Sequence, residues 1–391
     1  MILKKIKLHN WKNFQNCEVD LAERCFIIGA NASGKSNFID ALRFLRDIAK
    51  QSGGLQTAVE ERGGITKIRC LAARKKNNVS ITVELGNPNE AQNIWRYHLD
   101  FARTGGGVIK SQVKIIKEEV YSYCENKTII KRDNKSANED EETLKYTHLE
   151  QATANRSFRE LQVFFQDIKY LNVIPQMVRE SSLVVTSFTK DDYYGRYFLE
   201  RLAKMNERTR NSYFRRINEC LKIAVPQLEE LQFVKDPMGI SHLEVRHVHW
   251  RAKSKQQEMQ FSDGTLRLIG FLFALLDNHG VILLEEPEIN LHSGIISQIP
   301  AFISKIQRSK KSKSDSQILI TTHSYDLLSD LGISSDEVLL LQNTQEGATI
   351  QKLTELSDLK AIVDAGLSVA DAVIPATKPK EIEKLSQLTI L

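Results

Sequence analysis

Apolar and polar residues alternate in some stretches of this chain and form continuous apolar runs in others, and the two patterns predict two kinds of strand. Residues 1–8 and 79–85 alternate, which is typical of strands with one buried and one polar face. Three shorter runs are apolar throughout, as expected of strands buried in a parallel sheet: residues 26–28, 281–284 and 318–320. Together the patterns predict a mixed β-sheet.

Two other stretches show the helical period. Behind residues 26–28, apolar side chains recur three and four positions apart and predict an amphipathic helix. These side chains are Phe38, Ile39, Leu42, Leu45 and Ile48. Residues 266–276 are almost entirely apolar and predict a buried helix, for which Ser262 or Asp263 provides the N-cap. Helices that alternate with strands indicate an α/β fold.

The junction between the strand at residues 26–28 and the following helix carries the first chemical signal. It reads Gly29-Ala30-Asn31-Ala32-Ser33-Gly34-Lys35-Ser36 and fits the phosphate-binding pattern G-x-x-x-x-G-K-[ST], the P-loop. Backbone N–H groups at such a helix N-terminus point at an anion, and the helix dipole favours negative charge there. We expect Lys35 to reach the β- and γ-phosphates of a nucleotide and Ser36 to ligate Mg²⁺.

The apolar run at residues 281–284 ends in the acidic sequence Glu285-Glu286-Pro287-Glu288. Carboxylates at the carboxyl end of a parallel strand lie at the ligand crevice of an α/β sheet. Two adjacent glutamates are costly to bury there without a cation, so a metal ion is their natural partner. We expect Glu285 to hold Mg²⁺, directly or through water, and Glu286 to orient or deprotonate the attacking water.

The third apolar run ends in Thr321-Thr322-His323-Ser324. Because this strand repeats the pattern of residues 281–284, we expect His323 to face the same crevice and to sense the γ-phosphate. The N-terminus of the helix after Ser262 and Asp263 is a further candidate phosphate site. Taken alone, that segment also fits a well-capped buried helix without a ligand.

The order of these motifs along the chain is specific. The P-loop, the segment Ser262-Asp263-Gly264-Thr265, the acidic strand end and the segment with His323 resemble, in this order, the ABC-type ATPase heads of the RecF, SMC and OLD-nuclease group. Asn31 and Asn37 strengthen the resemblance, because this group favours an Asn inside its P-loop and another after the Ser. Only about 70 residues follow His323, too few for the Toprim nuclease domain of OLD nucleases. The chain therefore resembles a stand-alone head, like the ATPase subunits of two-gene bacterial anti-phage systems.

The resemblance implies an α/β P-loop NTPase head that binds ATP and Mg²⁺ and forms a homodimer or higher homo-oligomer through ATP. It implies the ATP-binding residues Gly29, Asn31, Ser33, Gly34, Lys35, Ser36 and Asn37, with Ser262, Asp263 and Gly264 acting on ATP held by the opposite subunit. It makes Lys35, Glu286 and His323 the catalytic residues. Residues 170–176 resemble the Q-loop, so Gln176 joins Ser36 and Glu285 at Mg²⁺, with Gln166 as the alternative.

Three features depart from the family pattern. Glu285 stands where SMC heads carry Asp, which lengthens the metal ligand by one methylene group. The D-loop reads Ile289-Asn290-Leu291-His292 and lacks its usual Asp, which weakens the expected communication between subunits. About 85 residues separate Gln176 from Ser262 and carry no sustained heptads, so a long SMC-like arm is excluded.

Composition limits the setting of the protein. No apolar run in the 391 residues reaches the length of a membrane span, and the N-terminus does not resemble a signal peptide. Five cysteines without a C-x-x-C pair predict neither a disulfide framework nor a zinc site and favour the reducing cytoplasm. The net charge of +5 is modest. Basic residues gather in three places that either contact DNA or form solvated faces: residues 208–222, 246–255 and 308–313.

We predict three parts of the chain. Residues 1–178 form the N-terminal part of the head, residues 179–258 a short helical arm or lid insertion, and residues 259–391 the C-terminal part, whose last strand lies at residues 336–341 and is followed by a helical tail. The expected function is an ATPase that regulates a separate effector, a nuclease or toxin, in anti-phage defence. Two alternatives stay open: a RecF-like DNA-binding ATPase in repair, and a slow-turnover scaffold gated by nucleotide.

Overall fold

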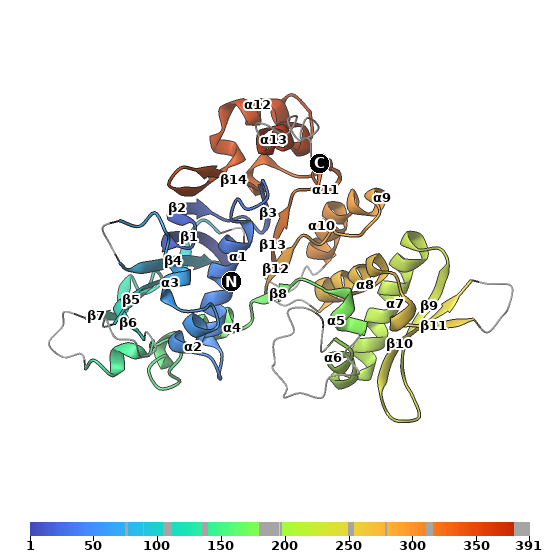
Figure 1. Ribbon diagram of the computed structural model, residues 1–391, viewed down its shortest axis with the longest axis horizontal. Helices are drawn as coiled ribbons and strands as arrows, with labels where there is room; N and C mark the ends of the chain where they lie inside the picture. The colour runs from blue at the N-terminus through green and yellow to red at the C-terminus, as the bar shows by residue number, and fades with distance from the viewer. Residues whose placement is uncertain are drawn as a thin grey trace, which may run out of the picture.

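The computed structural model describes residues 1–74, 77–88, 90–104, 112–134, 140–179, 195, 198–248, 254–277, 280–309 and 316–378. Figure 1 shows two lobes with a sheet between them. The lobe on the left contains the N-terminal strands and helices α1–α4, the lobe on the right contains α5–α8 and β9–β11, and α12 and α13 lie at the top. Strands and helices mix throughout, which confirms the α/β prediction.

The sheet between the lobes has the strand order β15-β14-β3-β13-β12-β8. Its strands are β3 (Arg24–Gly29), β8 (Lys169–Leu171), β12 (Val281–Glu285), β13 (Gln317–Thr322), β14 (Val338–Thr344) and β15 (Gly347–Lys352). Neighbouring strands are parallel except β15, which runs antiparallel to β14. The three continuous apolar runs are confirmed as the inner strands β3, β13 and β12, whose side chains are buried on both faces.

The register of this sheet brings three strand ends to one edge. Glu285 on β12 lies opposite Thr321 on β13, and Thr322 on β13 lies opposite Ile28 on β3. The P-loop, the acidic segment and the segment with His323 therefore leave the sheet at the same edge, where ligands of α/β folds bind.

One strand prediction is wrong in detail. The strand expected at residues 336–341 begins only at Val338, because Ser335–Glu337 forms a 3₁₀ turn closed by a capping box from Ser334. It is also not the last strand, since β15 returns along it as an antiparallel hairpin.

A second sheet is antiparallel, with the order β2-β1-β4-β5-β6-β7. Its strands are β1 (Ile2–Trp11), β2 (Phe14–Asp20), β4 (Val79–Gly86), β5 (Asn93–Arg103), β6 (Val113–Ser122) and β7 (Lys127–Asp133). The predicted alternation at residues 79–85 is confirmed, because alternate residues of β4 are buried. The buried face packs on α1, where Phe44 stacks on Phe101 with ring centroids 5.4 Å apart.

Helices cover both sheets. Those before the arm are α1 (Lys35–Ala49), α2 (Leu55–Glu60), α3 (Ile65–Ile68), α4 (Arg159–Gln166) and α5 (Pro175–Arg179). Those after it are α8 (Asp263–Leu276), α9 (Ser293–Ile296), α10 (Ile299–Ser309), α11 (Tyr325–Leu328), α12 (Ser357–Asp364) and α13 (Val369–Thr377). The expected amphipathic helix is α1, and the expected apolar helix is α8, which is buried along most of its length. Within the described ranges, every helix is too short or too polar to cross a bilayer.

The insertion between α5 and α8 is not purely helical. It contains α6 (Phe198–Lys204) and α7 (Glu207–Ala224), and also a three-stranded antiparallel sheet of β9 (Leu228–Lys235), β10 (Ser241–His247) and β11 (Lys255–Gln257). The apolar side of α7 packs toward this sheet, with Phe214 and Leu221 in one core with Leu243. The sequence underestimated the strands because their partly exposed residues give a weak two-residue period.

Two of the basic side chains in this arm serve its own fold. Arg246 forms ion pairs with Glu229 and Glu230 at 3.0 and 3.1 Å. Arg210 lies over the ring of Phe233, with 4.5 Å from its guanidinium carbon to the ring centroid.

The basic residues at 249–253 and 310–313 lie outside the described residues. The boundaries of the three predicted parts stay a prediction.

Candidate nucleotide site

Two glycines shape the loop between β3 and α1. Gly34 has a φ of 105°, which favours glycine, and a Cβ there would lie 2.1 Å from Asn13 Nδ2. A Cβ on Gly29 would lie 2.4 Å from Ser33 Oγ. Asn13 also ties the loop to the turn after β1, since its Nδ2 donates to the Ser33 carbonyl at 3.0 Å and its Oδ1 accepts from Asn37 Nδ2 at 2.9 Å. The loop is closed so tightly that both positions require glycine.

Lys35 begins helix α1 and lies inside this loop. The helix has no side-chain cap and no acidic residue in its first turn, so its first N–H groups are left for an anion. The buried Lys35 Nζ donates to the carbonyls of Gly29 and Ala30, at 2.9 and 3.3 Å. Burial lowers the pKa of Lys35, while Glu286, whose Oε1 lies 3.9 Å from Nζ, opposes the shift. This ammonium has the position and charge to bind a phosphate.

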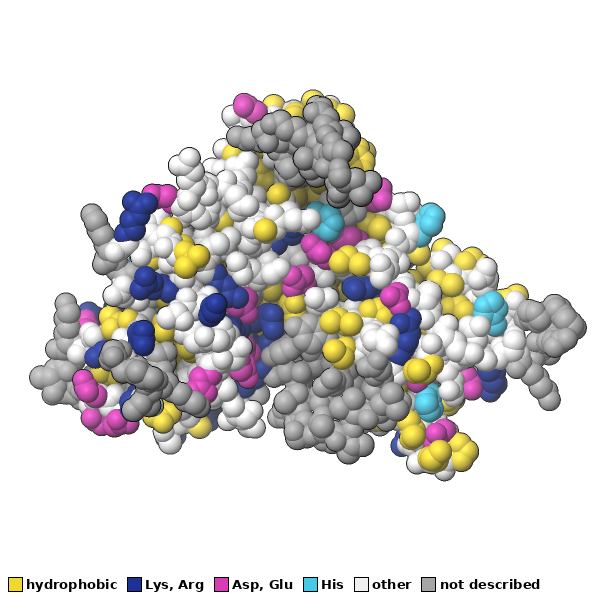
Figure 2. All heavy atoms as spheres, viewed as in Figure 1, with side chains coloured by type: hydrophobic (Ala, Val, Ile, Leu, Met, Phe, Trp, Pro, Cys, Tyr) yellow, Lys and Arg dark blue, Asp and Glu magenta, His cyan; other side chains and the backbone are white. Residues whose placement is uncertain are grey.

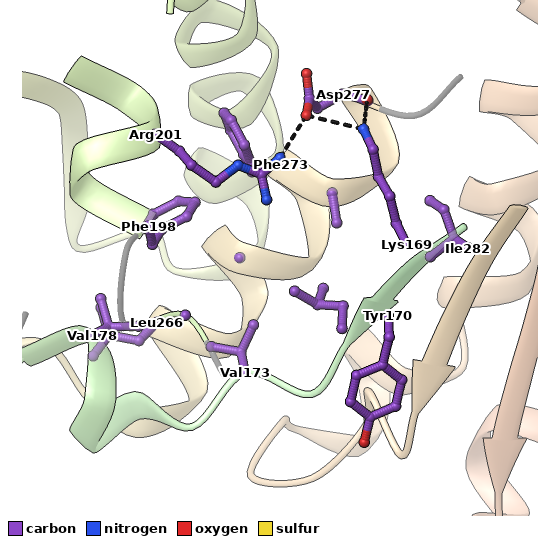
Figure 3. A pocket seen from close by; sticks show the side chains of 14 residues that line it. Lys169, Tyr170, Val173, Val178, Phe198, Arg201, Leu266, Phe273, Asp277 and Ile282 are labelled. Atoms are coloured by element: carbon purple, nitrogen blue, oxygen red, sulfur yellow. Dashed lines mark hydrogen bonds and ion pairs between the residues drawn. The ribbon is translucent and has the colours of Figure 1, made fainter. Parts of the chain in front are cut away.

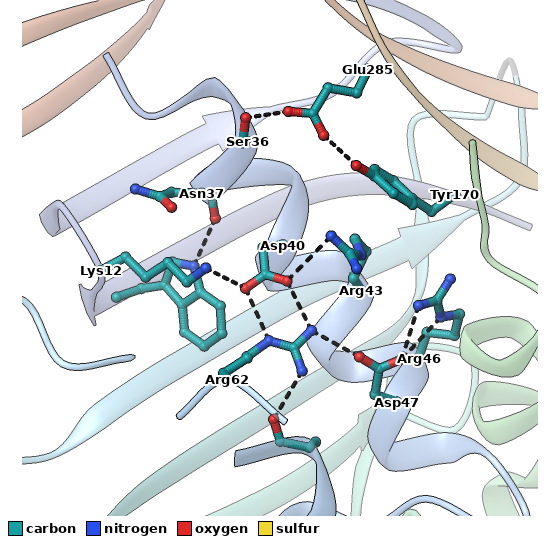
Figure 4. Close-up of polar contacts among 12 residues, drawn as sticks. Lys12, Ser36, Asn37, Asp40, Arg43, Arg46, Asp47, Arg62, Tyr170 and Glu285 are labelled. Atoms are coloured by element: carbon teal, nitrogen blue, oxygen red, sulfur yellow. Dashed lines mark hydrogen bonds and ion pairs between the residues drawn. The ribbon is translucent and has the colours of Figure 1, made fainter. Parts of the chain in front are cut away.

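Glu285, at the end of β12, is held on both carboxylate oxygens. Ser36 Oγ donates to Oε1, and the hydroxyl of Tyr170 on β8 donates to Oε2 (Figure 4). Burial and the adjacent Glu285 charge raise the pKa of Tyr170. The structure therefore brings the predicted metal residues Ser36 and Glu285 together.

These residues fit Mg²⁺. A serine hydroxyl and a glutamate carboxylate are hard oxygen ligands, and the same motifs contain two buried oxygens without a hydrogen-bond partner, Ser33 Oγ and Glu288 Oε2. Over the described ranges, no group of three or more His, Cys, Asp and Glu residues is arranged to hold a metal. Because Mg²⁺ usually binds through one or two carboxylates plus phosphates and water, the donor set suits an ion that arrives with a nucleotide.

Glu286 occupies a strained backbone position. Its φ of 43° is uncommon for a residue with a side chain. Residues held in such strained conformations cluster at functional sites. Its N–H donates to the Thr321 carbonyl at 3.0 Å, and its Oε1 lies 3.1 Å from Nδ1 of the exposed His323. The left-handed backbone thus places a carboxylate between the Lys35 ammonium and the His323 imidazole. Its role as the base stays a prediction.

Glu288 lies behind these groups and is buried. One of its oxygens accepts a hydrogen bond from the Thr322 hydroxyl, and the other has no partner. Burial raises the pKa of Glu288. In Figure 2, acidic side chains and a histidine side chain gather in the middle of the visible face, below the C-terminal helices.

The predicted signature residues lie at the start of α8. Ser262 is its N-cap, as expected, because its Oγ accepts the Thr265 N–H at 3.1 Å. Arg179 on α5 binds Asp263 Oδ1 at 2.5 Å, and a Cβ on Gly264 would lie 2.4 Å from the Asn290 carbonyl oxygen. In the described part of the chain, no hydrogen bond or ion pair joins residues 262–264 to the P-loop.

The two candidate Q-loop glutamines lie on different helices. Gln176 is exposed on α5, and Gln166 ends α4, where its Oε1 accepts from Gln162 Nε2 at 2.8 Å. From this region the Tyr170 hydroxyl reaches Glu285, and the sequence patterns assigned no role to Tyr170 or to Asn13. A tyrosine in a short apolar stretch has no pattern that separates it from a core residue.

A cavity of about 40 Å³ lies beside β8, next to the site and not within it. Apolar side chains such as Val173, Phe198 and Leu266 line it. At its rim, Lys169 and Arg201 both bind Asp277, at 3.2 and 2.8 Å (Figure 3). Its volume suits a few water molecules and not a nucleotide.

Comparison with known families gave two matches. The model described as "AAA domain, putative AbiEii toxin, Type IV TA system" matches residues 25–330. The model described as "P-loop containing region of AAA domain" matches residues 3–46. A search of curated proteins gave no match.

Solved structures with a similar fold include SMC heads. An SMC head bound to the C-winged helix domain of ScpA is 12% identical with a TM-score of 0.55, over 91% of this chain and 100% of that chain. The SMC head domains derived from Pyrococcus furiosus, bound to the C-terminal domain of ScpA, and from Pyrococcus yayanosii, with a coiled coil and joint, are 11% and 9% identical. Both give a TM-score of 0.50 over 93% of this chain and 99% of theirs. At these identities the likeness establishes the fold alone, that of an SMC head with a P-loop NTPase core.

Proposed function

The chain belongs to the AbiEii-type AAA domain family and has the fold of an ABC-type ATPase head, and from this premise we propose that it binds ATP with Mg²⁺, dimerises around the nucleotide and hydrolyses it. The observation that carries the proposal is the division of the site within one chain. The P-loop, Glu285, Glu286 and His323 lie together, while Ser262, Asp263 and Gly264 make their contacts elsewhere. A second copy is the natural source of the missing half.

In this proposal each residue has a distinct role. Lys35 and the N–H groups of the P-loop bind the phosphates, with Asn31, Ser33, Gly34 and Asn37 shaping the loop. Ser36 and Glu285 would hold Mg²⁺, which would neutralise phosphate charge, and Gln176 is the third predicted ligand. Glu286 takes a proton from the attacking water. His323 senses the γ-phosphate and is coupled to Glu286 through their hydrogen bond.

The Glu286→Gln variant tests this function. The amide cannot accept the proton, so the variant should bind ATP and lose hydrolysis. Light scattering should show a dimer of the variant with ATP and Mg²⁺, and Ser262→Arg should bind ATP but neither dimerise nor hydrolyse it. Glu346→Gln, at an exposed glutamate, is the matched control. A monomer that hydrolyses ATP at the full rate would overturn the composite site.

We further propose that the nucleotide state controls a separate effector, a nuclease or toxin, in cytoplasmic anti-phage defence. The family description, which names a toxin–antitoxin system, and the binding of a ScpA domain by similar SMC heads support an ATPase head that works with a partner. Different affinities of the effector for the two nucleotide states would suffice, and a coupling of about 1–3 kcal/mol acts as a switch.

Incubation of the purified protein with plasmid DNA, ATP and Mg²⁺ or Mn²⁺ tests this part. The protein alone should leave the plasmid intact, and a nuclease or toxin encoded as its partner should co-purify with it. Nicking that survives further purification and disappears in Glu285→Ala would show that the head itself cuts DNA.

A further inference from the structure

Tyr170 is the second side chain that holds Glu285. Its hydroxyl donates to Oε2, while Ser36 Oγ donates to Oε1. Figure 4 shows the three side chains in a row, which joins α1, β12 and β8. The backbone of Tyr170 pairs with Leu283, two residues before Glu285, so the tyrosine ring runs along β12 toward its carboxyl end.

The ring of Tyr170 is itself fixed. Tyr170 is only 6% exposed, and the guanidinium carbon of Arg43 lies 4.1 Å from its ring centroid, a cation–π contact. Arg43 lies seven residues after Ser36 on α1, which is two helical turns on the same face. Helix α1 therefore holds both Ser36 at one end of the row and the ring at the other.

Glu285 needs such a partner more than an aspartate would. Its side chain has one more rotatable bond than Asp, and each additional rotor must be ordered before the carboxylate can ligate a metal. A hydrogen bond to Oε2 removes this freedom and leaves Oε1 directed at Ser36, the other predicted ligand. Partners of this kind orient the ligating carboxylates of metal sites.

We propose that Tyr170 is a positioning residue that orients Glu285 and thereby sets the affinity for the Mg²⁺ that accompanies ATP. The proposal rests on the proposed function, because it assigns Mg²⁺ to Ser36 and Glu285. Tyr170 begins the stretch that resembles the Q-loop, but that resemblance assigned a role to Gln176 and none to Tyr170. The proposal gives Tyr170 a role, which is to hold the glutamate at position 285.

Tyr170→Phe tests the proposal, because it keeps the ring and the Arg43 contact and removes only the hydroxyl. Binding of a fluorescent ATP analogue is measured first in EDTA and then during a Mg²⁺ titration. Metal-free affinity should stay within about twofold, while the Mg²⁺ concentration that gives half of the metal-dependent increase in binding should rise about 10-fold or more. With Mn²⁺, electron paramagnetic resonance should show weaker metal binding to the protein–nucleotide complex.

Tyr97→Phe is the matched control. Tyr97 is also buried on a strand and its hydroxyl also donates to a buried carboxylate, Glu118, at 3.1 Å. It lies in the antiparallel sheet, so its loss should leave the Mg²⁺ requirement unchanged. In a Glu285→Asp background the carboxylate is drawn back from the hydroxyl, and Tyr170→Phe should then change the requirement by less than about twofold.

The outcomes separate the two claims. Wild-type protein that binds no nucleotide overturns the proposed function. Wild-type protein that binds Mg²⁺–ATP, together with a Tyr170→Phe variant of unchanged Mg²⁺ requirement, overturns the positioning role. Should Tyr170→Phe not fold, Arg43→Met loosens the ring and keeps the hydroxyl, and it should raise the requirement by about threefold, a shift whose absence also overturns the role.

Discussion

Two groups of carboxylates in this molecule are surrounded in opposite ways. In the antiparallel sheet, the fully buried Glu118 on β6 accepts hydrogen bonds from four donors. They are the Tyr97 hydroxyl at 3.1 Å, Arg132 Nη1 at 3.3 Å, and the backbone N–H groups of His148 and Leu149 at 2.9 and 3.3 Å. This carboxylate joins β5, β6, β7 and the segment after η1 (Thr143–Lys145).

Beyond the paired Glu285, the carboxylates at the end of β12 are less well compensated. Glu288 has one buried oxygen without a partner, and Glu286 is held with a φ of 43°. Lys35 Nζ lies 3.9 Å from Glu286 Oε1 and donates its hydrogen bonds to backbone carbonyls instead. The difference teaches how to read a buried acid: Glu118, which serves the fold, has both oxygens paired, while Glu288, beside the candidate site, keeps one acceptor free.

The largest expected effect is on stability, at the paired acid. Glu118→Gln leaves the Arg132 guanidinium buried without its counter-charge, so the free energy of unfolding should fall by about 3–5 kcal/mol. Denaturant unfolding followed by circular dichroism measures it. The neighbouring Glu119→Gln, whose partners Arg96 and Lys117 are partly exposed, should cost about 1 kcal/mol at most. Equal losses of stability in Glu118→Gln and Glu119→Gln would show that the pairing of Glu118 does not stabilise the fold.

At the ligand site the same kind of change should alter binding and not folding. Lys35→Ala removes the ammonium inside the P-loop, so the affinity for ATP should fall by at least about 100-fold, or about 2.7 kcal/mol. Its partners are carbonyls that tolerate the loss, and the free energy of unfolding should change by less than about 1 kcal/mol. Isothermal titration calorimetry and unfolding curves measure the two quantities. Lys5→Ala, on the surface of β1, should change neither.

The sequence predicted one side of this comparison well. The P-loop, the acidic strand end and His323 were recognisable because each follows a continuous apolar strand, and parallel strands end at one edge. Their convergence is a consequence of strand register, which those patterns specify. The role of Ser262 as a helix cap was predictable for a different reason, because caps depend on local sequence alone.

The other side was not predictable from local pattern. Tyr170, Asn13 and Glu118 each contact residues at least 20 positions away, through pairing between strands or between a turn and the P-loop. Nothing in their immediate sequence separates them from ordinary core or turn residues. The arm was predicted as helical for a related reason, because the three short strands β9–β11 are only partly buried.

A third change sharpens the comparison by removing strain. Glycine adopts a φ of 43° without the steric cost that Glu286 carries, so Glu286→Gly should raise the free energy of unfolding by about 1–2 kcal/mol while it abolishes ATP hydrolysis. Thermal unfolding and phosphate release measure the two effects. Glu286→Ala should lose hydrolysis without the gain, since alanine keeps the steric cost. A destabilised glycine variant would show that the left-handed backbone stores no strain.

The smallest effect is expected at Glu150, a partly buried acid that belongs to neither group. Glu150 is near Glu118 and accepts the Leu55 N–H at 2.6 Å and the Thr147 N–H at 3.1 Å, yet burial first, and then the charge of Glu118, raise its pKa to about 7. The folded protein therefore binds a proton at Glu150 more readily than the unfolded chain does. This contribution favours folding below the ordinary pKa near 4.5 and is lost as the pH rises to about 7. Glu150→Gln lacks it, so the variant should gain on the wild type by about 1 kcal/mol between pH 6 and pH 7, as measured by unfolding at both values. A difference that does not change with pH would mean that the two N–H donors hold Glu150 ionised throughout, which would group it with the fully paired Glu118.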